Sequence, residues 1–430
     1  MTRLTSTRRR LGLVAAAVLA MSSISGIGPV TAAVPPTSGI VCTSDASPNP
    51  SFTLHATSGF VGIPDGNTIF MWSFSDSGST AFQLPGPTLC VNQGDNVSVT
   101  LVNDLAEPVS IVFPGQTGVL AGGVPAEPQL SGSEVTSLVQ PAGPSGGSIT
   151  YTFTASEPGT YIYESGTDPA KQVQMGLYGA LVIRPAGHPD WAYDDVATQF
   201  KASTEYVMLF SEVDPDLHQA IERGLAYDFT TLHPRYWMIN GRSFPDTIAP
   251  NAASWLPTQP YSSIVHIEPF DASANPDPAL IRYLNVGALN HPFHPHGNHG
   301  RVIARDGRLL VGDGGEDLSY EKFAVLVGAG QTWDSTFKFT DEEGWNPSTN
   351  PIPVTIPQQQ NLVYKDDATW YSGSPYLGVQ DELPTGVVSF NQCGEFYHVA
   401  HSHALNEAAN YDAGFGGMLT LIRIDPPGGC

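Results

Sequence analysis

From about residue 45 onwards, the chain consists of short runs in which apolar and polar residues alternate, separated by turns rich in Gly, Pro, Asn and Asp. Residues 96–103 show the pattern clearly, since Val97, Val99 and Leu101 alternate with polar neighbours. Side chains on a strand point alternately to opposite faces of a sheet, so this period of two is typical of half-buried strands. Regular short strands of this kind predict an all-β fold of the sandwich or Greek-key type.

The predicted strands form two series, which indicate one domain over residues 45–185 and a second over 205–430, joined by a polar linker over 186–204. A short helix is expected over 215–225, and residues 342–383, rich in Pro, Asn, Gln and Asp, are expected to form a long surface excursion. The strands expected are 51–57, 68–75, 96–103, 148–155, 159–163 and 179–183 in the first series, and 205–212, 236–240, 262–268, 279–286, 300–305, 323–327, 332–339, 386–390, 395–401 and 417–424 in the second.

Residues 1–33 have the features of an export signal. Arg8, Arg9 and Arg10 precede a short apolar run from Leu13 to Met21, and small residues suited to cleavage follow. The paired arginines resemble the twin-arginine type of signal. The alternative is a membrane anchor, but the run is too short to span a bilayer. We therefore expect a secreted or extracytoplasmic protein without a membrane span.

The net charge of −23 is strongly negative, and the signal contributes only basic residues to it. A surface of this charge repels nucleic acid and anionic lipid, so neither is an expected partner. The four cysteines are an even number in a chain predicted to be exported, which favours two disulfides. All three pairings are open; pairing Cys42 with Cys90 and Cys393 with Cys430 would keep each disulfide within one domain.

Seven of the twelve histidines fall in two segments, residues 291–299 and 396–403. Each segment contains a His-X-His pair, formed by His294 with His296 and by His401 with His403. On a strand, both imidazoles of such a pair lie on one face, so two pairs on neighbouring strands would surround one point. Imidazole suits Cu, Zn, Fe and Ni. The pattern indicates a metal site, or a former site whose histidines now bond to one another or to water.

Several motifs resemble those of the multicopper oxidases, the family of laccases and related enzymes. They are Pro85-Gly86-Pro87-Thr88, Gly94-Asp95, residues 159–163 and 176–181, Ile239-Asn240-Gly241-Arg242, residues 291–297 and 401–403. The resemblance covers about residues 45–425. It implies two cupredoxin-like Greek-key β-sandwich domains, copper as the cofactor, and a small-molecule or metal-ion reductant together with dioxygen as partners. It leaves the oligomeric state open.

The family holds a type-1 copper with two His and one Cys, and a trinuclear cluster with eight His in four pairs. By this resemblance, His291 matches a type-1 ligand. His294 and His296 match one pair of cluster ligands, and His401 and His403 match another.

The departures from the family pattern concern the remaining ligands. Ser402 stands where the family has the type-1 Cys, and a hydroxyl cannot replace a soft thiolate. The second type-1 His should follow shortly after, where the chain reads Asn406-Glu407-Ala408. In the first domain, Val112 and Pro114 occupy one pair of ligand positions, and the segment 163–166 occupies the other.

The expected site is therefore a reduced set of His294, His296, His401 and His403, with His291 as either an auxiliary ligand or a polar packing residue. Glu164 would add a carboxylate if the two domains met as in the family, and is otherwise a solvated residue. For His299 and His398 we expect places beside the ligands or on the surface. No catalytic residue is assigned. The two functions that remain open are a copper-binding oxidoreductase and a non-catalytic copper-binding or structural protein of the same fold.

Overall fold

The computed structural model describes residues 36–76, 82–340, 396–410 and 416–425, all within one compact unit from Pro35 to Cys430. The predicted signal, the surface excursion over 342–383, the strand over 386–390, and Cys393 and Cys430 lie outside the described residues. Strands make up most of the regular secondary structure of the described residues, as the alternating pattern predicts. No helix among the described residues is long and apolar enough to cross a membrane.

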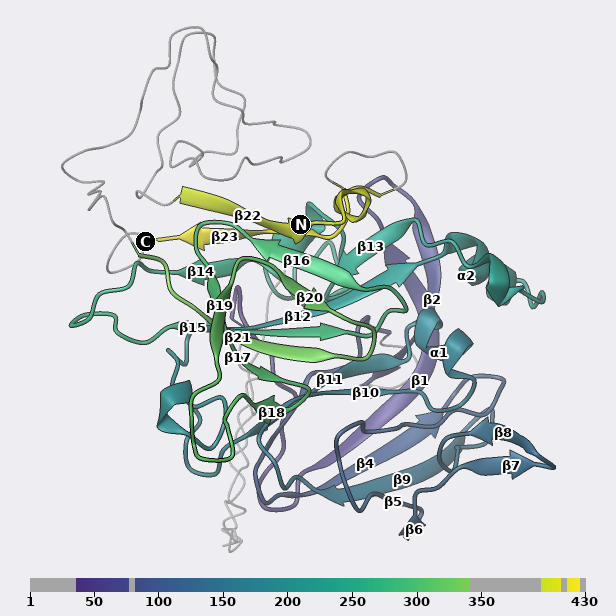
Figure 1. The fold of residues 1–430 in the computed structure, drawn as a ribbon. Helices are drawn as coiled ribbons and strands as arrows, with labels where there is room; N and C mark the ends of the chain where they lie inside the picture. Colours follow the sequence, from purple (N-terminus) through teal and green to yellow (C-terminus); the bar gives the residue numbers. More distant parts are fainter. Residues whose placement is uncertain (1–35, 77–81, 341–395, 411–415, 426–430) are drawn as a thin grey trace, which may run out of the picture. The chain divides into compact units, whose positions relative to one another are not determined.

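The strands up to residue 184 form two sheets and a small ribbon (Figure 1). The larger sheet has the order β2-β1-β4-β9-β5-β6, the second has the order β10-β11-β3, and β7 pairs with β8. The bounds are β1 Ser51–Gly62, β2 Thr68–Ser75, β3 Leu89–Asn92, β4 Asn96–Asn103, β5 Leu120–Ala121, β6 Val124–Pro125, β7 Gln129–Ser131, β8 Glu134–Ser137, β9 Gly147–Thr154, β10 Gly159–Glu164 and β11 Tyr178–Arg184.

The strands after residue 204 form two further sheets. One has the order β13-β12-β15-β21-β17-β18, with β19 also paired to β17, and the other has the order β14-β23-β22-β16-β20. The bounds are β12 Glu205–Val213, β13 Tyr236–Ile239, β14 Val265–Ile267, β15 Ala279–Asn285, β16 His291–Pro295, β17 Gly300–Arg305, β18 Arg308–Leu309, β19 Tyr320–Lys322, β20 Val325–Val327, β21 Thr332–Phe337, β22 Phe396–Ser402 and β23 Leu419–Ile424.

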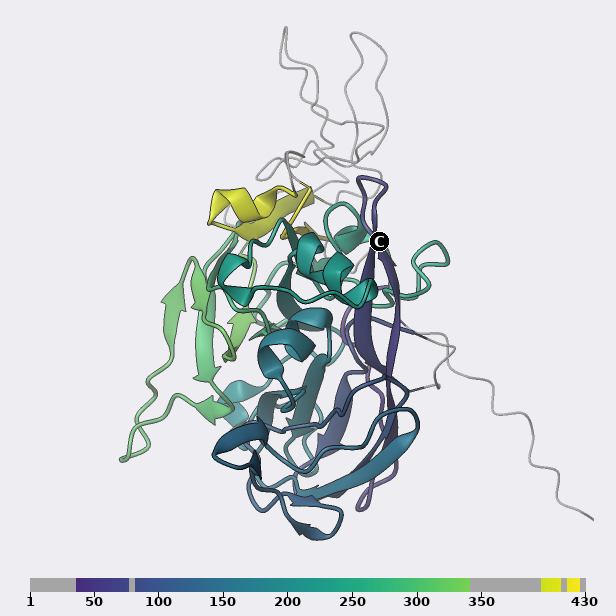
Figure 2. The ribbon, with the colours of Figure 1, turned by 90° about the vertical axis from the view of Figure 1, so that its right-hand side faces the viewer.

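Two short helices pack against β2 and lie on the same side of these sheets (Figure 2). Helix α2, Pro215–Glu222, confirms the predicted helix, and the Asp214 side chain caps it by accepting from the backbone N–H of Asp216. Helix α1, Pro169–Met175, was not predicted. The described residues also contain four 3₁₀ turns: η1 Val196–Thr198, η2 Phe229–Thr231, η3 Asp246–Ile248 and η4 Leu405–Ala408.

Each pair of sheets encloses its own apolar core, around residues such as Phe153 in the first and Phe293 in the second. A further apolar cluster contains Met71 and Tyr178 from the first series of strands together with Leu209 and Met238 from the second. Because these side chains pack together, the two series share buried surface. The division into domains at residues 185 and 205 stays a prediction, since residues 35–430 group as one compact unit.

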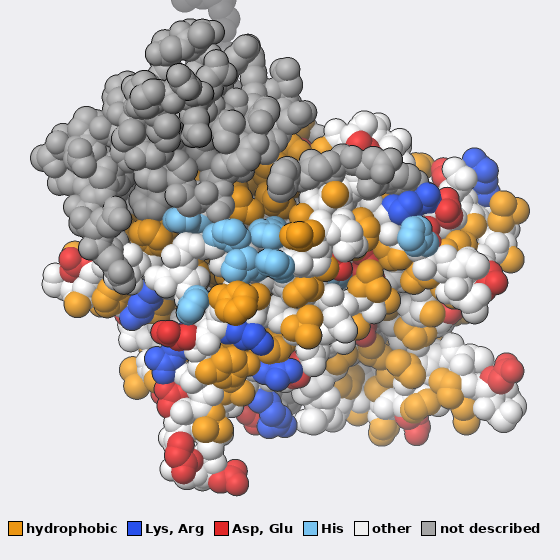
Figure 3. Space-filling model, turned by 45° about the horizontal axis from the view of Figure 1, so that its top comes forward, with side chains coloured by type: hydrophobic (Ala, Val, Ile, Leu, Met, Phe, Trp, Pro, Cys, Tyr) orange, Lys and Arg blue, Asp and Glu red, His pale blue; other side chains and the backbone are white. Residues whose placement is uncertain are grey.

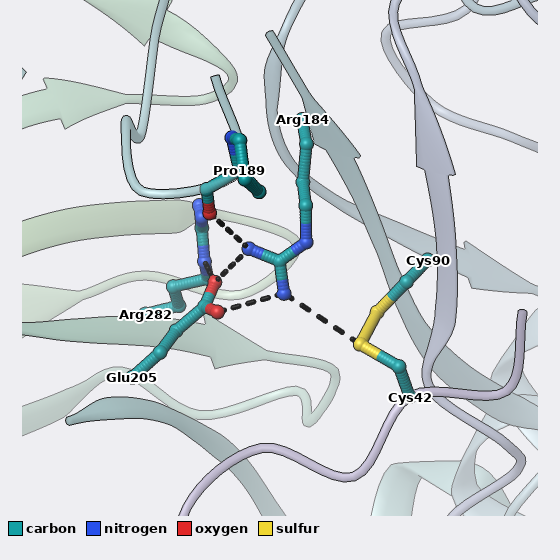
Figure 4. Close-up of a disulfide and its surroundings, with 6 residues drawn as sticks. All are labelled: Cys42, Cys90, Arg184, Pro189, Glu205 and Arg282. Carbon is teal, nitrogen blue, oxygen red and sulfur yellow. Dashed lines mark hydrogen bonds and ion pairs between the residues drawn. A yellow bond between two sulfur atoms is a disulfide. The ribbon is translucent and has the colours of Figure 1, made fainter. Parts of the chain in front are cut away.

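The predicted disulfide between Cys42 and Cys90 is present, and it lies beside a buried ion pair (Figure 4). Arg184, at the end of β11, donates to Glu205 of β12 over 3.0 Å and approaches Cys42 Sγ at 3.6 Å. Arg282 of β15 donates to the same carboxylate over 2.8 Å. Burial alone would raise the pKa of Glu205, but the two guanidinium groups lower it below its usual value. This pair therefore joins the first and second series of strands.

Candidate metal centre

The two histidine segments lie side by side on antiparallel strands. Strand β16 pairs with β22 so that His294 is opposite His401. Beyond the strand ends, the N–H of His296 donates to the carbonyl of Val399 over 2.9 Å, and the N–H of His403 donates to that of Pro292 over 2.7 Å. These bonds extend the ladder in both directions. All four imidazoles consequently share the outer face of the sheet, where histidine side chains gather on the surface (Figure 3).

The four rings His294, His296, His401 and His403, called the outer cluster below, form a compact group. Ring centroids are 4.5 Å apart for His294 and His296, 5.3 Å for His296 and His401, 5.4 Å for His294 and His403, and 5.7 Å for His401 and His403. The Nε2 atoms of His296 and His401 are joined by a hydrogen bond of 3.3 Å. The structure thus brings together the four residues that the His-X-His spacing singles out, while their role as ligands stays a prediction.

Backbone carbonyls orient two of these rings. His294 Nδ1 lies 2.6 Å from the carbonyl oxygen of Phe323, and His401 Nδ1 lies 2.8 Å from that of Ser402. A carbonyl oxygen only accepts, so each Nδ1 carries the proton and each Nε2 of a neutral ring keeps its lone pair. Histidines that bind metals are commonly held in this way, with one ring N–H donated to a carbonyl. The orientation therefore fits a ligand role for both Nε2 atoms.

Burial and neighbouring rings favour the uncharged form of two rings, those of His296 and His401. Burial, followed by the neighbouring imidazoles His294 and His401, lowers the pKa of His296 to about 4. Burial also lowers the pKa of His401. Because a metal binds the neutral form of imidazole, these two rings are ready to act as ligands at neutral pH.

The four imidazoles of the outer cluster are suitable ligands for copper, but their present arrangement does not form a complete metal site. Two ring nitrogens bound about 2.0 Å from one tetrahedral ion would lie about 3.3 Å apart, which matches His296 and His401. As the side chains stand, however, the described residues contain no group of three or more His, Cys, Asp or Glu that could hold a metal ion.

His291 lies on the opposite, inner face of β16 and is fully buried, so the structure does not bring it together with the outer cluster. Its Nδ1 is 2.9 Å from Glu407 Oε2, and its Nε2 is 3.2 Å from Glu212 Oε2. Burial alone would lower the pKa of His291, but the hydrogen bonds to Glu212 and Glu407 raise it to about 9. Sequence reasoning gave no role to Glu212, and it noted Glu407 only as standing where the family has a histidine.

Glu164 is also away from the outer cluster, at the end of β10. Its backbone pairs with that of Val112 through hydrogen bonds of 2.8 and 3.2 Å. Burial raises the pKa of its carboxyl to about 7. Of the two other nearby histidines, His299 is exposed and His398 is buried beneath Gly297. Gly297 has a φ of +96°, and a Cβ there would meet the His398 ring at 2.9 Å, so the turn after His296 requires glycine.

Comparison with known proteins agrees with this fold. Residues 79–188 match the family model described as multicopper oxidase. Multicopper oxidase VdtB of Byssochlamys spectabilis is 34% identical over 143 residues, which are 31% of this chain and 19% of that protein. L-ascorbate oxidase of Cucurbita maxima is 36% identical over 104 residues, which are 24% of this chain and 16% of that protein. These matches therefore cover less than a fifth of each relative.

Solved structures resemble a much larger part of the chain. The blue copper oxidase of Nitrosomonas europaea aligns with a TM-score of 0.57 at 18% identity, covering 86% of this chain and 85% of that one. The copper nitrite reductase of Nitrosomonas europaea aligns with a TM-score of 0.51 at 20% identity, covering 87% and 94%. At this identity the likeness concerns the fold, and it confirms the predicted all-β class with cupredoxin-like sandwiches. The family match and the curated relatives show that part of the chain is similar to the multicopper oxidases.

Proposed function

We propose that this protein is an exported copper-binding oxidoreductase of the multicopper oxidase type, whose site is reduced to the four imidazoles of the outer cluster. The observation that carries the proposal is the Nε2–Nε2 distance of 3.3 Å between His296 and His401, the spacing expected for two ligands of one ion. The similarity of residues 79–188 to the multicopper oxidases supports copper as that ion. Imidazole donors favour copper among the first-row metals as well.

The residues around the outer cluster would hold copper where solvent can reach it. The carbonyl oxygens of Phe323 and Ser402 fix the rings of His294 and His401, so that Nε2 of each neutral ring keeps its lone pair. His403 is exposed and the other three rings are half-buried, so a reductant can approach from solvent. When bound, copper supplies one-electron transfer from a reductant to dioxygen. We propose a small molecule or a metal ion as the reductant, because the acidic chain, with a net charge of −23, attracts cations.

Oxygen consumption tests the proposal. Copper-loaded protein is expected to consume dioxygen in the presence of a phenol or a reduced metal ion, and the metal-free protein is not. Export is tested separately, by finding the mature protein outside the cytoplasm with an N-terminus after about residue 33. Copper-loaded protein that is as inert as the metal-free form would contradict the oxidoreductase function while leaving copper binding intact.

A second candidate function is a non-catalytic copper-binding protein of the same fold. It is favoured by the first domain, where Val112 and Glu164 pair through their backbones at positions that hold imidazoles in the family. Gly166 is packed against Val112 so closely that a Cβ there would lie 2.7 Å from the valine side chain. This region is thus filled by protein atoms. Copper binding without oxygen consumption would support this second function.

A further inference from the structure

Directly beneath the outer cluster, on the inner face of β16 and β22, four polar side chains form one hydrogen-bonded chain, called the inner network below. Ser402 Oγ donates to Glu407 Oε2 over 2.5 Å. The same oxygen is 2.9 Å from His291 Nδ1, and His291 Nε2 is 3.2 Å from Glu212 Oε2. The exposed fractions are 0% for His291 and Ser402, 2% for Glu212 and 4% for Glu407. Solvent is therefore excluded from the whole group.

By the family resemblance, this is the place of the type-1 copper. His291 matches a type-1 ligand, Ser402 stands for the thiolate, and Glu407 stands where the second imidazole is expected. The backbone confirms that these positions meet, because the N–H of Ser402 donates to Met418 over 3.0 Å and the N–H of Met418 donates to Glu407 over 2.7 Å. These positions therefore lie together in this structure.

The hydrogen bonds of the inner network end on carboxylate oxygens. Glu212 Oε1 accepts from the backbone N–H of Ala288 and from the side chain of Gln174, while Glu407 Oε2 accepts from Ser402. An ionised carboxylate only accepts, and an imidazolium donates from both of its nitrogens. Both nitrogens of His291 face carboxylate oxygens, which is the arrangement that suits a ring protonated on both nitrogens. An imidazolium has no lone pair left for a metal.

We propose that the protonated ring of His291 takes the place of the type-1 metal ion, as an internal cation between Glu212 and Glu407, and that this position binds no copper. A buried charge is costly unless it is paired and hydrogen-bonded, and here each charged group has its partner. The network ties together β12, β16, β22 and η4, the elements that a copper ion would otherwise connect. This inference holds whether or not the outer cluster is catalytic.

Two measurements test the charge of His291. In ¹⁵N-labelled, metal-free protein near pH 7, the ring of His291, assigned with His291→Gln, is expected to show N–H protons on both nitrogens. A ring with a single N–H would overturn the proposal. In addition, His291→Gln is expected to lower the melting temperature by roughly 5 °C, because two buried carboxylates lose their cation. The matched control His266→Gln changes a histidine in the same part of the fold that is partly exposed, and should have a smaller effect.

Copper titration tests the exclusion of metal, with the outer cluster disabled by His294→Ala/His403→Ala. This protein is expected to take up no copper at the inner position. The further change Ser402→Cys in the same background is expected to stay without intense blue colour, because His291 is still held by two carboxylates. One equivalent of copper that is lost on His291→Gln would overturn the proposal, as would a blue colour produced by Ser402→Cys alone.

Discussion

The two faces of β16 and β22 carry histidines in opposite circumstances. On the outer face, His296 and His401 are partly buried among other imidazoles, and burial with neighbouring rings lowers the pKa of His296 to about 4. On the inner face, His291 is buried between two carboxylates, which raise its pKa to about 9. The same side chain is therefore a neutral potential ligand on one face and an internal cation on the other. What decides its role is the charge of its neighbours, not its position in a metal-binding motif.

Removing two rings of the outer face is the most direct test of the difference between the two faces. His294→Ala/His403→Ala should weaken copper binding by at least about 1,000-fold, since loss of even supporting contacts around a metal ligand costs about 10–100-fold. Copper should then no longer raise the melting temperature. Calorimetric titration and thermal melts measure the two effects.

Controls for this double substitution come from histidines outside both faces. His55 bonds to Asp104, and His188 stacks on Trp191, so His55→Ala and His188→Ala should leave copper binding unchanged. His218 is unsuitable, because it is fully buried and bonded to the carbonyl of Phe70. If the double variant keeps the parent's copper affinity, the metal is held elsewhere.

Removing the disulfide should affect overall stability without distinguishing the two faces. Cys42 and Cys90 are separated by 48 residues, and closing a loop of this length stabilises a protein by about 4 kcal/mol in the chain-entropy account. Cys42→Ser/Cys90→Ser should lower the free energy of unfolding by about that amount, measured by urea denaturation. Copper affinity of the folded variant should match the parent's. A weaker affinity would show that the outer cluster depends on this distant part of the fold.

The inner face should show a dependence of stability on pH. The folded-state pKa of His291, about 9, lies above its ordinary value of 6.5. Its contribution of about 3 kcal/mol is therefore fully present below pH 6.5 and is lost as the pH rises through 9. Urea denaturation of metal-free protein at pH 6 and pH 9.5 measures the loss. The variant His291→Gln should lack this part of the pH dependence, and an identical pH dependence in both proteins would refute the assignment.

The smallest expected effect concerns the rim of the outer cluster. Phe323 is 58% exposed, and its ring lies edge-on to His294 with centroids 5.5 Å apart. An aromatic contact of this kind contributes about 0.5–1.5 kcal/mol, so Phe323→Ala should weaken copper binding by roughly 2–10-fold. Leu326→Ala is the matched control, because Leu326 is 49% exposed on the neighbouring strand. Equal effects of the two substitutions would mean that the ring of Phe323 does not support His294.

Sequence reasoning predicted the features that depend on local periodicity. The alternation of Val97, Val99 and Leu101 corresponds to buried positions along β4, and the same rule placed His294 with His296 on one face. The prediction that His294 lies beside His401 depended on their strands being neighbours. Which strands are neighbours is set by the tertiary fold. The register that places them opposite each other is set by pairing between segments more than 100 residues apart, so no local pattern contains it.

The inner network could not be predicted in the same way. Glu212, His291 and Glu407 come from three distant segments, and a lone glutamate at the end of an apolar strand looks like a solvated residue. Helix α1 was missed for a different reason, since its seven residues show no sustained apolar period. A usable signal was present there: Pro169 begins the helix and Gly176 follows its last residue, the arrangement that helices favour.

The inner network also affects how the protein reaches its finished state. A copper ion has to be acquired from outside, so a site that needs one depends on the supply of copper. The proton that gives His291 its positive charge comes from water. The core beneath β16 and β22 is therefore complete as soon as the chain has folded. Maturation of this part of the molecule is then independent of metal supply, and a chain refolded with a chelator present should regain the melting temperature of native metal-free protein.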